Sequence, residues 1–300
     1  MKKVLLTGPT GFIGRHSINI LLSRGFEVHA ISRETSNEQQ EGLFWYKADL
    51  LDIGIVSKLV SEIQPTHMLH FAWYAVPKEY WTSSENIRWV QASLELLRSF
   101  ILYGGKRVVM AGSCAEYDWN YGDCSEYLTP LKPATLYGTC KHSLQDILSM
   151  YTKQAGISSA WGRIFFLYGP HEHHSRLVSH VISSLLQNKE AVCSSGTQIR
   201  DFMYVEDVAS AFVSLLDSSV EGPVNICSGQ PISVKEVVTL IGKKIGLPGL
   251  IKFGTHLATN EPPLLIGDNG RLFDEVKWKQ PTDISKGIDK SIGWWRKQFA

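Results

Sequence analysis

The sequence predicts a doubly wound α/β fold: a parallel sheet covered by helices on both faces, with a smaller C-terminal α/β lobe. Short apolar runs alternate with segments of helical periodicity, which is the pattern of such a sheet. The expected strands are 3–7, 27–32, 66–72, 106–112, 158–166 and 223–227. The expected helices are 13–23, 86–102, 141–153, 176–187, 205–216 and 233–245.

Composition argues against several classes of protein. The 300 residues are 44% hydrophobic and carry a formal net charge of +1 with no long block of either sign, which disfavours binding to nucleic acid or an anionic membrane. No apolar segment approaches the roughly 20 residues of a membrane span, and the N-terminal apolar run is too short for a secretion signal. Five cysteines without metal-ligand spacing leave an odd thiol. We therefore expect a cytoplasmic protein that binds neither nucleic acid nor membranes.

Residues 5–16, LLTGPTGFIGRH, place Gly8, Gly11 and Gly14 between an expected strand and an expected capped helix. The first two glycines permit a tight turn and a close approach of backbone N–H groups to a pyrophosphate, and the third lets the helix pack on the strand. This context favours a dinucleotide site over a chance glycine-rich turn. Residues 1–167, with about 203–227, are then expected to form a dinucleotide-binding domain, and residues 168–300 mainly a substrate-binding lobe.

An ordered series of motifs resembles the short-chain dehydrogenase/reductases, and among them the extended branch, the NAD-dependent epimerase/dehydratase family that acts on nucleotide sugars. The resemblance implies a Rossmann-type sheet, and a homodimer formed by the helices around 86–102 and 137–153. After the glycines, the motifs in order are ADL with Asp49, HFAW with His70 and Ala72, ENI with Asn86, GSCAEY with Ser113, YGTCK with Tyr137 and Lys141, YGP at Tyr168, and RDFMYVEDVA from Arg200.

Ser113, Tyr137 and Lys141 are the expected catalytic residues. Tyr137 and Lys141 are four apart, so they share one face of a helix, and the ammonium is expected to lower a phenol pKa that is ordinarily about 10. Ser113 ends an expected strand at the edge of the sheet where ligands bind. In the family that the motifs resemble, the serine and tyrosine engage the reacting sugar oxygen and the lysine also holds the nicotinamide ribose. The alternative is a packed tyrosine beside a solvated lysine.

The end of the second expected strand indicates the cofactor. An acidic residue there would bond the adenosine ribose and repel a 2′-phosphate, but Ser32 occupies the position and Arg33 follows it. This pattern favours NADP, with Arg15 as a second candidate for the phosphate, while Glu34 leaves NAD open. By resemblance, the expected cofactor site consists of Gly8, Thr10, Gly11, Phe12, Ile13, Gly14, Ser32, Arg33, Asp49, Leu50, Phe71, Ala72, Tyr137 and Lys141.

The later motifs indicate the substrate. By resemblance, Arg200 grips the diphosphate of a nucleotide sugar; the alternative is a salt bridge to Asp201, Glu206 or Asp207. Phe166 stands where family members often carry an asparagine, so some contacts to the substrate are expected to differ.

Aromatic and histidine residues complete the expected substrate region. Trp73, together with Tyr74 and Trp81, is expected to line the sugar site beside Ser113. The histidines at 171, 173 and 174 have no second ligand cluster, so we expect a loop that borders the substrate pocket and no metal site. His180 lies where GDP-fucose synthase-like enzymes carry a histidine. Cys114, however, is one residue out of register with the cysteine of their serine motif, so their epimerase chemistry is not carried over.

The reaction is narrowed by the residues after Ser113. Dehydratases of the family carry Asp-Glu there, because loss of water needs an acid and a base besides the tyrosine, whereas this chain has Cys114 and Ala115. Dehydration and the related decarboxylation are therefore disfavoured. We expect NADPH-dependent reduction at C4 of a nucleoside diphosphate-linked 4-keto-6-deoxyhexose. The alternatives are a 4-epimerase with tightly bound NAD and, from another class, a non-catalytic dinucleotide-binding sensor.

Overall fold

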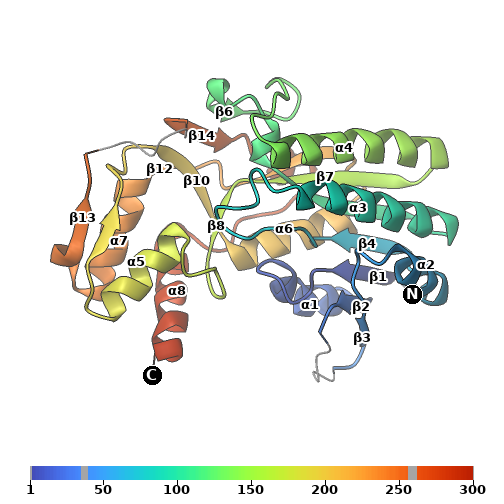
Figure 1. Cartoon of the computed structure of the whole chain (residues 1–300), viewed down its shortest axis with the longest axis horizontal. Helices are drawn as coiled ribbons and strands as arrows, with labels where there is room; N and C mark the ends of the chain where they lie inside the picture. Colours follow the sequence, from blue (N-terminus) through green and yellow to red (C-terminus); the bar gives the residue numbers. More distant parts are fainter. Residues whose placement is uncertain (1, 35–39, 256–261, 300) are drawn as a thin grey trace.

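A seven-stranded parallel sheet organises the N-terminal part of the computed structural model, which describes residues 2–34, 40–255 and 262–299 (Figure 1). The strand order is β11-β7-β5-β4-β1-β2-β3, and all neighbours are parallel. The predicted doubly wound parallel sheet is therefore confirmed. Its strands are β1 (Lys2–Thr7), β2 (Phe26–Ser32), β3 (Leu43–Lys47), β4 (His67–His70), β5 (Arg107–Ser113), β7 (Ser158–Ile164) and β11 (Gly222–Ile226).

Helices cover both faces of this sheet. On one face, α1 (Gly14–Ser23) packs against α6 (Val205–Asp217); on the other, α3 (Glu85–Leu102) lies between α2 (Ile53–Ile63) and α4 (Leu136–Ala155) (Figure 1). Alternate residues of β1 enter opposite layers, because Val4 and Leu6 belong to the core under α1 and α6 while Leu5 belongs to the core under α2 to α4. Burial on both faces explains why the strand is apolar throughout.

The sheet order reverses between β1 and β4, which are neighbours at its centre. From β1 the chain continues to β2 and β3 on one side, and from β4 it continues to β5 and β7 on the other. In open α/β sheets, ligands bind outside the carboxyl ends of the strands at such a reversal. The loops after β1 and β4 therefore begin at the position where a ligand is expected.

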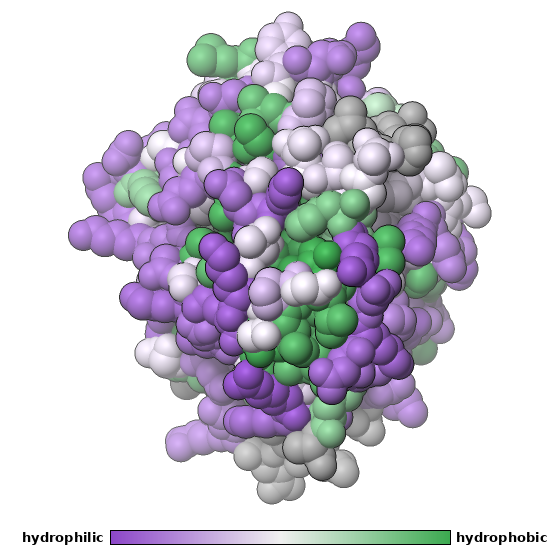
Figure 2. Space-filling model, turned by 90° about the vertical axis from the view of Figure 1, so that its left-hand side faces the viewer, coloured by the Kyte–Doolittle hydropathy of each residue, from purple (hydrophilic) through white to green (hydrophobic). Residues whose placement is uncertain are grey.

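A smaller unit follows in the C-terminal part of the chain. It contains the sheet β12-β10-β14-β6, with β8 paired to β10, and a separate pair β13-β9. Figure 2 views the end of the molecule that this unit forms and shows an apolar patch surrounded by hydrophilic residues. Its elements are β6 (Asp123–Cys124), β8 (Phe166–Tyr168), α5 (Leu177–Leu186), β9 (Ala191–Cys193), β10 (Ile199–Tyr204), β12 (Pro231–Ser233), α7 (Val234–Ile245), β13 (Ile251–Phe253), β14 (Leu264–Gly267) and α8 (Ile284–Phe299).

Several expected elements differ from the structure. The expected strand 158–166 is two strands, because β7 ends at Ile164 and β8 pairs with β10 of the smaller sheet. The segment 199–204 also joins the smaller sheet, so only α6 and β11 return to the large one. Helix α4 begins at Leu136, five residues before the expected start, since the Thr135 hydroxyl accepts from the Gly138 N–H at 3.1 Å and caps it. Strand β3 and helices α2 and α8 were not expected.

A helix that crosses a membrane is long and predominantly apolar. None in the described part of the chain combines the length and the hydrophobicity that crossing a membrane requires.

Candidate active site

The loop after β1 forms a backbone cradle. Gly8 has φ +67°, and a Cβ at this position would lie 3.0 Å from the Ala72 nitrogen. A Cβ at Gly14 would lie 2.1 Å from the Gly8 carbonyl oxygen, so Gly14 lets α1 approach the loop itself and not, as expected, the strand. The Gly11 N–H donates to the same oxygen at 3.0 Å. Ile13 precedes α1 and provides no side-chain cap, contrary to the expectation of a capped helix.

This cradle fits the pyrophosphate of a dinucleotide. A helix that begins without a side-chain cap keeps N–H groups available for an anion, and the three glycines leave space for phosphate oxygens close to the backbone. Phe71 and Ala72 lie directly across from the cradle, since Ala72 N–H donates to the Thr7 hydroxyl at 3.2 Å at the end of β1. Thr10 and Gly11 are exposed, and Phe12 and Ile13 are half-buried.

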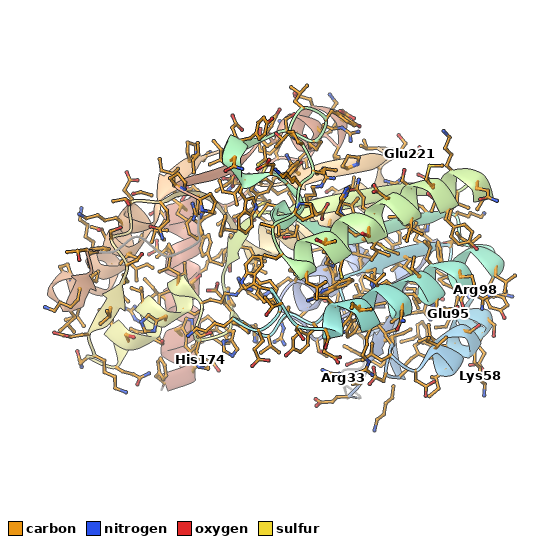
Figure 3. The ribbon with its side chains drawn as sticks, turned by 45° about the horizontal axis from the view of Figure 1, so that its top comes forward. Arg33, Lys58, Glu95, Arg98, His174 and Glu221 are labelled. Carbon is orange, nitrogen blue, oxygen red and sulfur yellow. The ribbon has the colours of Figure 1, made fainter. Side chains whose placement is uncertain are left out.

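The other expected cofactor residues follow β2 and β3 along the same edge of the sheet. Ser32 is buried at the end of β2, and its hydroxyl accepts from the Glu34 N–H at 3.4 Å. Arg33 is exposed and lies at the outer edge of the molecule (Figure 3). Asp49 is exposed and accepts from the Leu51 N–H at 3.0 Å, while Leu50 is buried. The adenosine end of a dinucleotide extending from the cradle would reach this group.

Arg15 is held by the glycine loop and by His171. Its Nε donates to the Gly11 carbonyl at 3.1 Å, and its guanidinium also donates to the Thr10 carbonyl and to His171 Nδ1, the latter at 2.6 Å. The His171 ring packs on Trp294 of α8 at 4.7 Å between centroids. Arg15 therefore joins the glycine loop to the C-terminal unit, and its expected role at the cofactor phosphate stays a prediction.

His173, His174 and His180 follow His171 along the chain. His173 and His174 are exposed and pack on each other, and His174 lies at the edge of the C-terminal unit (Figure 3). His180 lies on α5 and is half-buried. In the described residues, no group of three or more His, Cys, Asp or Glu side chains has an arrangement that could hold a metal ion.

Ser113 and Tyr137 meet at the carboxyl end of β5. Ser113 ends the strand, its hydroxyl accepts from the Ala115 N–H at 3.2 Å, and it lies close enough to Tyr137 to oppose the rise that burial causes in the pKa of the phenol. Tyr137 and Lys141 both lie in the first two turns of α4, as their spacing predicts. The Lys141 amine is buried, donates to the Ala111 carbonyl at 2.8 Å and lies 3.6 Å above the Trp73 ring.

The titration of this pair differs from the expectation. Burial lowers the pKa of Lys141 to about 7, and the Glu116 carboxylate opposes that shift. Burial also raises the pKa of Tyr137, with Tyr80 contributing, while the hydrogen bond with Ser113 opposes the rise. The expected lowering of the Tyr137 pKa by Lys141 is therefore wrong, because the amine is directed at a carbonyl and an indole ring. The phenol is protonated at neutral pH.

Aromatic side chains enclose the Tyr137 ring. Its centroid lies 4.9 Å from that of Tyr80, 5.8 Å from that of Trp81 and 6.5 Å from that of Trp73, all in edge-to-face arrangements. The loop that carries these three residues is fixed by Asn86, which is fully buried. Its side chain accepts from Trp73 Nε1 at 2.8 Å and donates to the Tyr80 carbonyl at 2.7 Å.

Arg200 lies on β10 and is 2% exposed. Its guanidinium lies 5.2 Å from the Phe166 ring centroid, and Nη1 donates to the Ile199 carbonyl at 2.9 Å. Two of the three carboxylates considered as alternative salt-bridge partners of Arg200 accept hydrogen bonds from other groups. Asp201 accepts from Ser228 and Gly229, and Asp207 accepts from Thr282. Phe166 therefore contacts the arginine that is expected to grip the diphosphate.

Three residues of this site were not expected from the sequence. Tyr80 and Trp119 complete the aromatic enclosure, and Trp119 packs on Trp81 at 6.0 Å. The only clue to Tyr80 and Trp119 in the sequence is that the two polar loops that carry them are rich in aromatic residues. Glu116 lies behind Ser113. The clue to it in the sequence is the Ser-x-x-Glu spacing of a capping box, and Ser113 and Glu116 form this capping box in the structure.

Known proteins resemble this chain in sequence and in fold. A family model described as the NAD dependent epimerase/dehydratase family matches residues 4–227. The chain belongs to this family. The match confirms the family that the motifs resemble, and with it an enzyme of the short-chain dehydrogenase/reductase type.

Individual members of the family resemble this chain over nearly its whole length. UDP-glucuronic acid decarboxylase 1 of Xenopus tropicalis is 28% identical over 99% of this chain and 73% of that protein. CDP-abequose synthase of Salmonella typhimurium is 24% identical over 96% of this chain and 97% of that protein. The solved structure of MoeE5 in complex with UDP-glucose and NAD is 25% identical, with a TM-score of 0.86 over 99% of this chain and 100% of that one.

Proposed function

We propose that this protein reduces a nucleoside diphosphate-linked 4-keto-6-deoxyhexose at C4, with NAD(P)H as the reductant. The observation that carries the proposal is the position of Tyr137 beside Ser113 at the carboxyl end of β5, where burial raises the pKa of the phenol so that it is protonated at neutral pH. A protonated phenol is the proton donor that ketone reduction needs. An epimerase begins by oxidising an alcohol and needs the phenolate first.

Each residue has a defined role in this proposal. The dinucleotide, when bound by the glycine cradle, supplies the hydride. Tyr137 gives its proton to the nascent alkoxide, and the Ser113 hydroxyl donates a hydrogen bond to the same oxygen and polarises the ketone. Lys141 holds the ribose, and Arg200 binds the diphosphate as a guanidinium fork.

The surroundings of Tyr137 favour a sugar without a carboxylate. Tyr80, Trp81 and Trp73 give the site apolar walls that suit a 6-deoxy carbon. Cys114 and Ala115, which follow Ser113, are buried and carry no carboxylate, so the acid and base that dehydration needs are missing there. The resemblance to a protein named CDP-abequose synthase supports the link to deoxysugars.

A 4-epimerase with tightly bound NAD is the second candidate. It is supported by the resemblance to MoeE5, whose structure holds UDP-glucose and NAD. Stoichiometry separates the two candidates: the purified protein is incubated with NADPH or NADH and a panel of nucleotide-linked 4-keto sugars, and in parallel, without added cofactor, with the corresponding 4-hydroxy nucleotide sugars. We expect one reduced nicotinamide consumed per sugar converted. Sugar interconversion without net consumption, by protein that purifies with NAD, would establish the epimerase.

We also propose that NADPH is preferred over NADH, with Ser32 and Arg33 binding the 2′-phosphate. Replacing Arg33 by glutamine is expected to weaken NADPH binding about tenfold and to leave NADH binding unchanged, because only NADPH carries the phosphate that the guanidinium would bond. Calorimetric titration measures both affinities. Lys58→Gln, which removes another exposed cation, on α2, is the matched control. Equal affinities of the Arg33 variant and the wild type for NADPH would show that Arg33 does not bind the 2′-phosphate, and tighter binding of NADH than of NADPH by the wild type would assign the preference to NAD.

A homodimer formed by α3 and α4 is the proposed assembly. The two helices pack side by side (Figure 1) and expose apolar residues, among them Leu102, which is 61% exposed, and Met150, which is 67% exposed. Met150→Glu is expected to convert the dimer into a monomer in size-exclusion chromatography with light scattering, because it places a charge in an apolar interface. Val192→Glu, an equally exposed position on β9, is expected to leave the dimer intact. A Met150 variant that stays dimeric would move the interface elsewhere.

A cytoplasmic location is proposed as well. All five cysteines are free thiols and all are buried. Thiols persist in a reducing compartment. Fractionation of cells that express the tagged chain is expected to place it with the cytoplasmic fraction.

A further inference from the structure

A buried carboxylate, Glu116, lies directly behind the catalytic serine. Its Oε1 accepts from the Ser113 N–H at 2.7 Å and from Trp161 Nε1 at 2.9 Å, and its Oε2 accepts from Arg163 Nε at 2.7 Å. Both members of the Glu116–Arg163 ion pair are fully buried. Such a pair is expensive to bury, and a purely apolar contact would often be as stable. Because the Glu116–Arg163 ion pair lies next to Ser113, we expect it to have a function in the active site.

Three consecutive residues of β5 connect Glu116 to Lys141. The Ala111 carbonyl accepts from the Lys141 amine, and the Ser113 N–H donates to Glu116. Between them, Gly112 makes room for the carboxylate, since a Cβ there would lie 2.6 Å from Glu116 Oε1 and 2.0 Å from Trp161 Nε1. The strand end thus binds Glu116 through the Ser113 backbone N–H and the Lys141 amine through the carbonyl two residues earlier.

The other groups around Lys141 offer it no negative charge at neutral pH. Burial holds the pKa of His70, on β4, at about 3, so this ring is neutral; it bonds to the Thr7 and Ser93 hydroxyls. Cys140, the neighbour on α4, has a thiol whose pKa is raised by burial. The remaining partners are the rings of Trp73 and Trp161. Among these groups, Glu116 is the anion.

We propose that Glu116 is a positioning residue of the active site: it fixes Ser113 at the end of β5 and supplies the buried negative charge that the Lys141 ammonium requires. The proposal rests on the proposed function only for the roles of Ser113 and Lys141. Arg163 holds Glu116 in place and keeps it from acting as an acid or base on substrate.

The charge is tested by titrating Lys141 directly. Protein labelled with ¹³C at the lysine Cε positions is titrated by NMR, with the Lys141 signal assigned by its loss in Lys141→Met. We expect a midpoint near pH 7 for the wild type. Glu116→Gln is expected to lower the midpoint by about one unit or more, since an opposite charge nearby favours the charged form. No substrate is involved, so the result is independent of the proposed reaction.

Three further variants distinguish the effect of the Glu116 charge from that of a structural change. Glu126→Gln, the same change at another buried carboxylate with a backbone N–H partner, is expected to leave the Lys141 midpoint unchanged. Glu116→Asp keeps the charge and is expected to have the wild-type midpoint and a lowered kcat, because the shorter side chain loses the hydrogen bond from the Ser113 N–H. If Glu116→Gln does not fold with Arg163 unpaired, Glu116→Gln/Arg163→Gln removes both charges. It is expected to lower the midpoint by less than Glu116→Gln, because loss of the Arg163 cation partly offsets loss of the carboxylate. A midpoint equal to that of the wild type in the folded Glu116→Gln or double variant would overturn the proposal.

Discussion

Replacing Tyr137 by phenylalanine is expected to lower kcat about 10²- to 10⁴-fold, with KM nearly unchanged, because the variant loses only the proton donor and keeps the ring in its aromatic enclosure. Steady-state kinetics with the reduced dinucleotide and the 4-keto sugar measure both constants. Tyr151→Phe, the same change farther along α4 and away from the site, is expected to match the wild type.

The outcome of this substitution also bears on the non-enzymatic alternative. A Tyr137→Phe variant that kept more than about a tenth of kcat would show that the phenol is not the proton donor. If the wild type showed no turnover and both forms bound the dinucleotide equally, the protein would be a dinucleotide-binding sensor and the catalytic account would be wrong.

Replacing Gly14 by alanine is expected to weaken dinucleotide binding at least about 100-fold, because a misplacement of about 1 Å in a positioned site has effects of this size. The new Cβ would lie 2.1 Å from the Gly8 carbonyl oxygen, so the loop that cradles the pyrophosphate must move. Calorimetric titration with NADPH and NADH measures the loss, and circular dichroism confirms that the variant is folded.

A matched glycine on another helix provides the control for Gly14. Gly293 lies on α8, and a Cβ there would have no neighbour within 4 Å. Gly293→Ala is expected to leave dinucleotide binding unchanged and to stabilise the helix by about 0.5–1 kcal/mol. Unchanged dinucleotide affinity in the Gly14 variant would contradict the assignment of the loop.

The residues of the expected cofactor site lie along one edge of the sheet because the sequence signals that indicate them are local. The glycines, the strand before them and the helix after them are contiguous, and the residues after β1 to β4 meet at one edge by the rule of parallel sheets. The position of β10 depended on partners far along the chain, since Ile199 pairs with Ser233 and Leu264. No periodicity within 199–204 distinguishes the two sheets.

The electrostatics of the catalytic residues could not be predicted from spacing. Tyr137 and Lys141 share a helix face, but the Lys141 amine is directed by the Ala111 carbonyl and by Trp73, which come from β5 and the loop after β4. Burial then dominates both pKa values. The capping-box spacing of Ser113 and Glu116 was present in the sequence, as it was for Ser233 and Glu236, whereas the Arg163 partner of Glu116 lies in a different strand.

The most direct measurement of the central claim follows the hydrogen that is transferred. The protein is incubated with a 4-keto-6-deoxy sugar nucleotide and reduced dinucleotide carrying deuterium at C4 of the nicotinamide, in each of the two configurations in turn. With one configuration, the account predicts a product with deuterium at C4 of the sugar, formed by the wild type and at least about 100-fold more slowly by Tyr137→Phe. A product without deuterium from both labelled cofactors, or with deuterium at another carbon, would contradict it.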